Sequence, residues 1–171
     1  FVWPKTFALS KAYVDQLVFD EYPSDDSFTF VEMTLKNPEV LPKISDFAIW
    51  NEAGDHTEEM LQGKQLLILS SNIDKITLSV NELDKISALI NAFQGSEVNV
   101  HWVAASSEEK MTEFLQEKGL RLSAYMADAT VVKTIIRSNP GLVFLENGTV
   151  LKKFHYRNAP SPEIAKTIFS K

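Results

Sequence analysis

Four polar side chains stand where an apolar run of the chain gives way to a helical pattern. They follow the run at residues 66–69, and they are Ser71, Asn72, Asp74 and Lys75. Ligands of open α/β sheets commonly bind at this place, beyond the carboxyl ends of the strands. Asp74 and Lys75 have the chemistry of an acid–base pair, although such residues more often cap a helix or face solvent. No Gly-rich phosphate-binding loop accompanies them.

Residue types that are missing from the chain exclude several kinds of chemistry. The chain contains no cysteine, so it has no disulfide, thiolate metal ligand or cysteine nucleophile. Its three histidines lie far apart without ligand spacing, and we expect neither a metal nor another cofactor. A Gly-x-Ser-x-Gly elbow is also missing, although a Ser-His-Asp triad assembled from distant residues stays open. His101 is expected to be a hydrogen-bonded, neutral histidine of the core, on the strand face opposite Trp102.

The length and charge indicate one acidic globular domain. The 171 residues include 17 Lys+Arg against 23 Asp+Glu, a net charge of -6. Nucleic-acid binding needs a basic footprint, so we expect no nucleic-acid partner. The end of the chain is locally basic, which fits an anionic partner or, more simply, an edge strand protected by lysines. The basic residues of this segment are Lys152, Lys153, His155 and Arg157.

Strand and helix patterns alternate through most of the chain. The continuous apolar run at residues 66–69 is typical of a strand buried on both faces, and residues 98–105 alternate like a second strand. A helical apolar stripe follows at residues 81–93. A further helix is predicted after Ser106, whose hydroxyl is expected to form a capping box with Glu109.

The closing part of the chain predicts a helix, a hairpin and a last helix. Asp128 is placed to cap the first of these, and Asn147-Gly148 is a dipeptide that suits a tight hairpin turn. The last helix is predicted to begin at Ser161, with a proline in its first turn. The side chains expected to face inward from it are Ile164, Ile168 and Phe169. Strands that alternate with helices and end in a hairpin predict an α/β fold, a three-layer sandwich with a mixed central sheet.

The amino-terminal part differs from the rest in composition. Residues 1–43 are expected to form a β extension that packs on, or leads into, a domain at residues 44–171. Within the extension, residues 29–36 alternate like a half-buried strand. A short strand at residues 47–50 and a turn-rich stretch after it predict a hairpin, with Thr57 capping one helical turn.

Two stretches resemble thioredoxin-like domains of the peroxiredoxin and TlpA type. Residues 44–54 together with 61–69 are similar to the entry segment of these domains, and residues 138–150 are similar to the stretch that carries their cis-proline. The resemblance covers about residues 44–171. It implies a cis bond before Pro140, with Asn139 at the position whose backbone receives an extended substrate in redox-active relatives.

The chain departs from that family at its reactive centre. The C-x-x-C of the family falls near residues 75–78, and this chain has no cysteine there or elsewhere, so neither thiol–disulfide exchange nor peroxide reduction by a cysteine is expected. The resemblance therefore implies a groove for a peptide or another ligand, against the simpler reading of a structural turn. The residues of the candidate groove are Ser71, Asn72, Asp74, Lys75, Asn139 and Pro140.

A narrower resemblance suggests where the domain works. Residues 127–143 and 149–156 are similar to a soluble domain that follows DoxX-type membrane segments in Bacteroidetes proteins. That likeness implies a periplasmic, membrane-associated domain tethered to the inner membrane through a segment outside this chain. We expect a non-enzymatic binding domain for an unidentified protein or peptide, or for its own membrane segment. The alternatives are an enzyme of non-thiol chemistry and an accessory subunit of a thiol-redox system.

Overall fold

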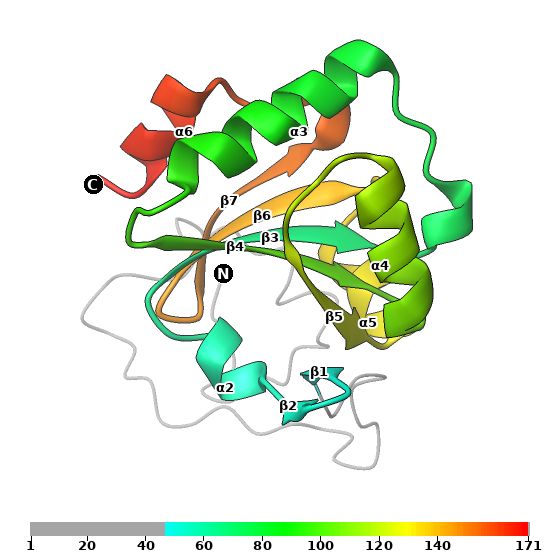
Figure 1. Cartoon of the computed structure of the whole chain (residues 1–171). Helices are drawn as coiled ribbons and strands as arrows, with labels where there is room; N and C mark the ends of the chain where they lie inside the picture. The colour runs from blue at the N-terminus through cyan, green and yellow to red at the C-terminus, as the bar shows by residue number, and fades with distance from the viewer. Residues whose placement is uncertain (1–46, 171) are drawn as a thin grey trace, which may run out of the picture. The chain divides into compact units, whose positions relative to one another are not determined.

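A mixed sheet of seven strands forms the centre of the computed structural model, which describes residues 47–170 (Figure 1). The strand order is β2-β1-β5-β4-β3-β6-β7, in which β3, β4 and β5 run parallel and the other pairs run antiparallel. The strands are β1 (Ile49–Asn51), β2 (Gly54–Asp55), β3 (Lys64–Ser70), β4 (Val98–Ala104), β5 (Ser123–Ala127), β6 (Gly141–Glu146) and β7 (Thr149–His155).

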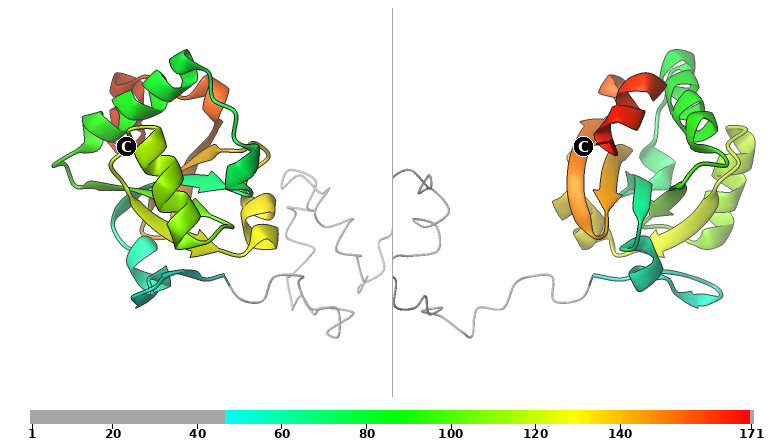
Figure 2. Two further views of the ribbon diagram at one scale, coloured as in Figure 1. Left: turned by 45° about the vertical axis from the view of Figure 1, so that its right-hand side comes forward. Right: turned by 90° about the vertical axis from the view of Figure 1, so that its left-hand side faces the viewer.

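Helices cover both faces of the sheet, which makes the predicted three-layer α/β sandwich. Side chains of α3, α4 and α6 join the core on one face, and those of α2 and α5 join the core on the other. Figure 2 shows α3 and α6 side by side over the same face. The bounds are α2 (Thr57–Met60), α3 (Val80–Phe93), α4 (Glu108–Glu117), α5 (Ala129–Ile135) and α6 (Pro162–Ile168), with single turns η2 (Ile73–Lys75) and η3 (Tyr156–Asn158).

The run at residues 66–69 is the centre of the sheet, as its pattern predicts. All four side chains are buried, and they alternate between the two cores because successive side chains of a strand point to opposite faces. Trp102 of β4 is fully buried in the core beneath α3 and α4. The central strands are therefore enclosed on both faces, while β7, with its lysines, lies at the sheet edge.

The turn between β6 and β7 confirms the hairpin prediction. Asn147 and Gly148 both have positive φ, 48° and 76°, which is what a two-residue turn of this kind requires. The Asn147 side chain also accepts a hydrogen bond from the Gly63 N–H at 3.0 Å. The hairpin is thereby joined to the start of β3.

Helix starts are confirmed in part. Asp128 caps α5 through hydrogen bonds from the Thr130 and Val131 N–H groups, and Ser161 caps α6. The prediction for α4 is wrong, because Ser107 and not Ser106 is its N-cap and makes no side-chain cap bond. Thr57 is not a cap either: the N-cap of α2 is His56, and the Thr57 hydroxyl accepts the Ile49 N–H at 2.9 Å.

One side chain of α6 faces the opposite way from the prediction. Ile164 is 56% exposed, whereas Ala165 is fully buried. The helix therefore packs through the face that carries Ala165 and Phe169, where a small residue permits close approach to the sheet. Phe169 is buried and Ile168 half-buried against the same core, as predicted.

Parts of the sequence-based prediction fall outside the described residues. The strand expected at residues 29–36 and the whole extension at 1–43 lie there, so both stay predictions. None of the helices in the described part is both long and apolar enough to cross a bilayer.

Candidate functional site

Asn139 lies at the carboxyl end of the central strand because β6 begins two residues later. Gly141 is paired with Leu69, the penultimate residue of β3, in an antiparallel register. A Cβ atom on Gly141 would lie only 2.7 Å from a methyl carbon of Ile136, so glycine lets the chain pass closely here. The peptide bond between Asn139 and Pro140 is cis. These features place the Asn139 side chain against the segment that follows β3.

The Asn139 amide joins that segment through four hydrogen bonds, which we call the Asn139 network. Its Oδ1 accepts from the Ser70 hydroxyl at 2.7 Å, from the Ser71 N–H at 2.9 Å and from the Asn72 N–H at 3.4 Å. Its Nδ2 donates to the Asn72 backbone carbonyl at 2.7 Å. Both polar atoms of one side chain thus hold the last residue of β3 and the two residues that follow it, which are 67–69 positions away in sequence.

The backbone of Asn139 has no such partners in the part of the chain that the structure describes. Within residues 47–170, no hydrogen bond uses its N–H or its carbonyl oxygen. The residue is half-buried, and Pro140 beside it is buried. The arrangement therefore fixes the position of Asn139 through its side chain, while its backbone donor and acceptor have no partner among residues 47–170.

The candidate residues after β3 divide into two groups. Ser71 and Asn72 belong to the Asn139 network, and Asn72 also caps η2 by accepting the Lys75 N–H at 3.2 Å. Asp74 and Lys75 are exposed. The Asp74 carboxylate is 3.3 Å from the Lys110 ammonium of α4, so the ion pair formed is not the acid–base pair considered from sequence.

Ser70 is the member of this site that sequence analysis missed. It is fully buried at the end of β3, and its hydroxyl makes one of the two shortest bonds of the network. Its position in the sequence, a serine that directly follows the apolar run at residues 66–69, could have indicated that it belongs to the site. Because the network contains hydroxyl, amide and backbone groups, it has no side chain that exchanges protons near neutral pH. Its geometry suits holding and recognition.

A second polar cluster lies on the face of the sheet that carries α2 and α5. The ring of Tyr125 stands between those of His56 and His101, edge to face, with ring centres 5.1 and 5.2 Å away. The Nδ1 of His56 is 2.8 Å from a Glu59 carboxylate oxygen, and its Nε2 is 3.0 Å from Asn51 Oδ1. The sequence did not predict this cluster, because His56 and His101 lie far apart along the chain.

His101 departs from the predicted satisfied core histidine. Burial lowers its pKa, which favours the neutral ring as expected. Its Nδ1 atom, however, is buried and has no hydrogen-bond partner among residues 47–170. Burial also raises the pKa of Tyr125. In the same part of the chain, no group of three or more metal-ligating side chains comes together.

Comparisons with known proteins find likeness in structure alone. No family model matches the chain, and no curated protein matches it. Crystal structures of StoA from Bacillus subtilis and of copper-bound Sco1 from yeast each superpose with a TM-score of 0.51 at 16% identity. They cover 75% and 77% of this chain, and 99% and 96% of their own.

A third solved structure agrees with these two. A thiol:disulfide interchange protein from Bacteroides sp. superposes with a TM-score of 0.53 at 13% identity, over 72% of this chain and 84% of its own. At such identities the likeness concerns the fold. The strand order, the packing of helices on both faces and these neighbours together show that the chain has a thioredoxin-like fold, here built without a single cysteine.

Proposed function

We propose that this protein is a redox-inactive binding domain that holds an extended peptide segment of a partner protein at Asn139. The absence of cysteine removes the sulfur chemistry of the fold, since thiol–disulfide exchange requires a thiolate. The Asn139 network supports the proposal because it fixes the loop after β3 without using the Asn139 backbone. An extended peptide pairs with backbone groups of this kind by β-augmentation.

The open backbone pair of Asn139 carries the proposal. A donor and an acceptor on one residue match the acceptor and donor of one residue of an extended strand. Ser71 and Asn72 stand opposite, so their side chains border the peptide, while exposed Asp74 and Lys75 contribute charge at its periphery. Recognition then depends on backbone shape first and on side chains second.

Titration of the full 171-residue chain with a library of extended peptides, followed by backbone amide NMR shifts, tests this site. Binding peptides are expected to shift the amides of residues 71–72, 139 and 141. Asn139→Ala is expected to weaken binding at least about tenfold, because the loop opposite loses its anchor. The matched control is Asn158→Ala, an exposed asparagine whose side chain makes no hydrogen bond within residues 47–170. Shifts confined to other surfaces would remove the proposal.

The place of action is the second part of the proposal. We assign the domain to the periplasmic side of the inner membrane, tethered through a DoxX-like segment outside this chain. The likeness of residues 127–143 and 149–156 to domains that follow such segments supports this. Protease added to intact spheroplasts carrying the natural gene product should then cleave the domain. Protection until the membrane is lysed would contradict the assignment.

A further inference from the structure

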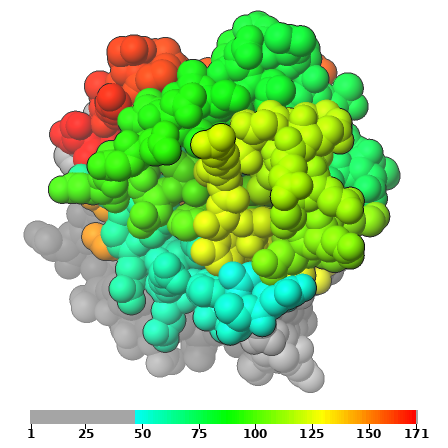
Figure 3. All heavy atoms as spheres, viewed as in Figure 1, coloured from blue at the N-terminus to red at the C-terminus, as the bar shows by residue number. Residues whose placement is uncertain are grey.

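A pocket lies at the opposite end of β4 from the Asn139 network. It has a volume of about 440 Å³ and opens between the second half of α3 and the residues that precede β5. Pockets that bind small ligands usually measure about 300–1,000 Å³. The green side chains of α3 and the yellow-green residues before β5 border one another on this face (Figure 3). The pocket is therefore large enough for one amino-acid residue and its flanking groups.

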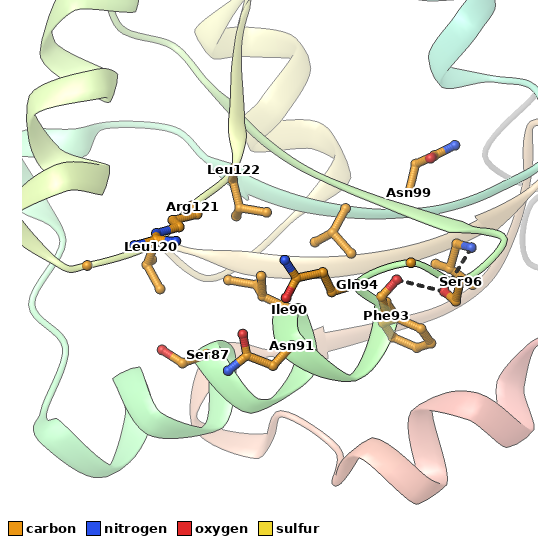
Figure 4. Close-up of a pocket in the computed structure, with 14 residues that line it drawn as sticks. Ser87, Ile90, Asn91, Phe93, Gln94, Ser96, Asn99, Leu120, Arg121 and Leu122 are labelled. Carbon is orange, nitrogen blue, oxygen red and sulfur yellow. Dashed lines mark hydrogen bonds between the residues drawn. The ribbon is translucent and has the colours of Figure 1, made fainter.

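The lining of the pocket is apolar at its floor and polar at its rim. Half-buried Ile90, Val100 and Leu122 form part of the floor, and all three pack against the core. Asn91 of α3 and Gln94, which directly follows α3, project toward the segment at 120–122 (Figure 4). The rim also includes Ser87 and Ser96, and Arg121 carries the one charge among the lining residues.

The backbone of β4 opens into this pocket. Ala105 N–H bonds to the Ser70 carbonyl of β3, whereas Val98 N–H turns to the Ser96 hydroxyl at 3.2 Å. Since the backbone groups of successive residues in a strand point to alternate sides, Val98 and Val100 both direct theirs away from β3. That is the side on which β5 lies.

The strand on that side, β5, does not pair with these residues. The β4–β5 ladder starts at His101 and Ser123, and residues 120–122, which precede β5, are not part of it. No hydrogen bond of the described part uses the Val98 carbonyl or the Val100 N–H. In a parallel pair, these two groups bond to the N–H and the carbonyl of one and the same partner residue. The pocket thus contains a pairing position for a single residue.

We propose that this pocket binds the C-terminal residue of an extended peptide. Its N–H pairs with the Val98 carbonyl, and one carboxylate oxygen accepts the Val100 N–H. An apolar side chain lies on Ile90 and Leu122, and the carboxylate faces Arg121, the cation of the pocket. The side chains of Asn91 and Gln94 bond to the preceding peptide group. This site is separate from the one proposed at Asn139 and does not depend on it.

The probe is N-acetyl-Ala-Leu with a free carboxylate, compared with the same dipeptide amidated at its C-terminus. Each is titrated into the full 171-residue chain, and backbone amide shifts are recorded. We expect saturable shifts at residues 98–100 and 119–123, with the free acid binding about fivefold tighter than the amide, as a charge-assisted bond implies. Arg121→Gln is expected to abolish that preference.

Two further variants separate the pocket from general effects of charge or folding. Ser87→Trp places a large ring at the rim and is expected to weaken both dipeptides at least about tenfold, with the fold verified by its amide spectrum. Lys152→Gln removes one positive charge from exposed β7 and should leave both affinities unchanged. Shifts confined to residues 71–72 and 139–141 would overturn the proposal, as would equal binding of acid and amide or the absence of shifts.

Discussion

Asn139 and His101 are both polar residues set against a central strand, but their hydrogen bonding differs completely. Every polar atom of the Asn139 side chain is bonded, to three donors and one acceptor. His101 Nδ1 and the Oε1 atom of Gln65, on the neighbouring strand β3, are buried without partners in the described part of the chain. Gln65 lies two residues before Leu67, the partner of His101 in the β3–β4 ladder. Both side chains therefore lie on the face of the sheet that carries α2 and α5.

The two residues are therefore expected to affect the free energy of folding differently. A buried polar atom without a partner loses its hydration and gains nothing in return, whereas a fully bonded amide recovers that loss. The Asn139 network thus stabilises the loop opposite the candidate peptide site. Burial lowers the pKa of His101, so we expect this position to lower stability at acid pH. Substitution of Asn139 should therefore destabilise the protein, whereas substitution of His101 should stabilise it at acid pH.

Asn139→Ala should show the largest effect. It leaves the Ser70 hydroxyl and the Ser71 and Asn72 N–H groups without their acceptor in a half-buried place. We expect the free energy of unfolding to fall by about 2–3 kcal/mol. Urea denaturation followed by circular dichroism measures this, with Asn158→Ala as the matched control. A loss no larger than that of the control would show that the network does not stabilise the fold.

His101→Phe should have a smaller effect, and one that depends on pH. The lowered pKa of folded His101 means that the unfolded chain takes up a proton first as the pH falls below the usual value of 6.5. One such proton reduces the free energy of unfolding by at most about 1.4 kcal/mol per pH unit. The nearby charges of Glu59 and His56 act in opposite directions on this pKa.

The phenylalanine variant keeps an aromatic ring against Tyr125 but has no ring nitrogen that can bind a proton in the unfolded chain. We therefore expect wild type and variant to differ little at pH 8, and the variant to be the more stable at pH 5. Urea unfolding at both values tests the sign. The control is His155→Gln, which removes an exposed histidine at the end of β7. A wild-type slope in the His101 variant would assign the pH dependence to other groups.

The fold was largely predictable because its signals are local. A continuous apolar run fixes a buried strand, Asn147-Gly148 fixes a turn, and Asp128 fixes a helix start. The position of Asn139 against the loop after β3 followed from the resemblance, since no local pattern relates two segments so far apart. The Ser70 bond, the Tyr125 cluster and the β4 pocket needed the register of the strands.

The start of α4 differs from the sequence-based prediction by a single residue. Ser106 and Ser107 both precede a glutamate pair, and a capping box would form if the helix began one residue earlier. In the structure, Glu108 turns to the hairpin between β1 and β2, where its carboxylate accepts the Glu52 N–H at 2.8 Å. A tertiary contact at the first helical residue thus competes with the local box.

A pair of serine substitutions should show the smallest effects and the sharpest contrast. The Ser79 hydroxyl accepts from the Glu82 N–H, and the Glu82 carboxylate accepts from the Ser79 N–H at 2.8 Å, so α3 begins with a complete capping box. Ser79→Ala should reduce the free energy of unfolding by about 1 kcal/mol. Ser107→Ala at the N-cap of α4 should change it by less than about 0.5 kcal/mol, because that hydroxyl makes no cap bond.

Urea denaturation of both serine variants is measured under the same conditions. The effect that any serine-to-alanine change has on the free energy of unfolding then cancels in the comparison. Equal losses would mean that the Ser107 hydroxyl does cap α4 in solution, at the N-cap position that the structure gives it. Unequal losses, with Ser79 the larger, would show that the Ser107 hydroxyl contributes no cap, as expected where Glu108 contacts the β1–β2 hairpin. The start of α4 is then set by packing of the chain on itself, in the same way that Asn139 sets the loop after β3.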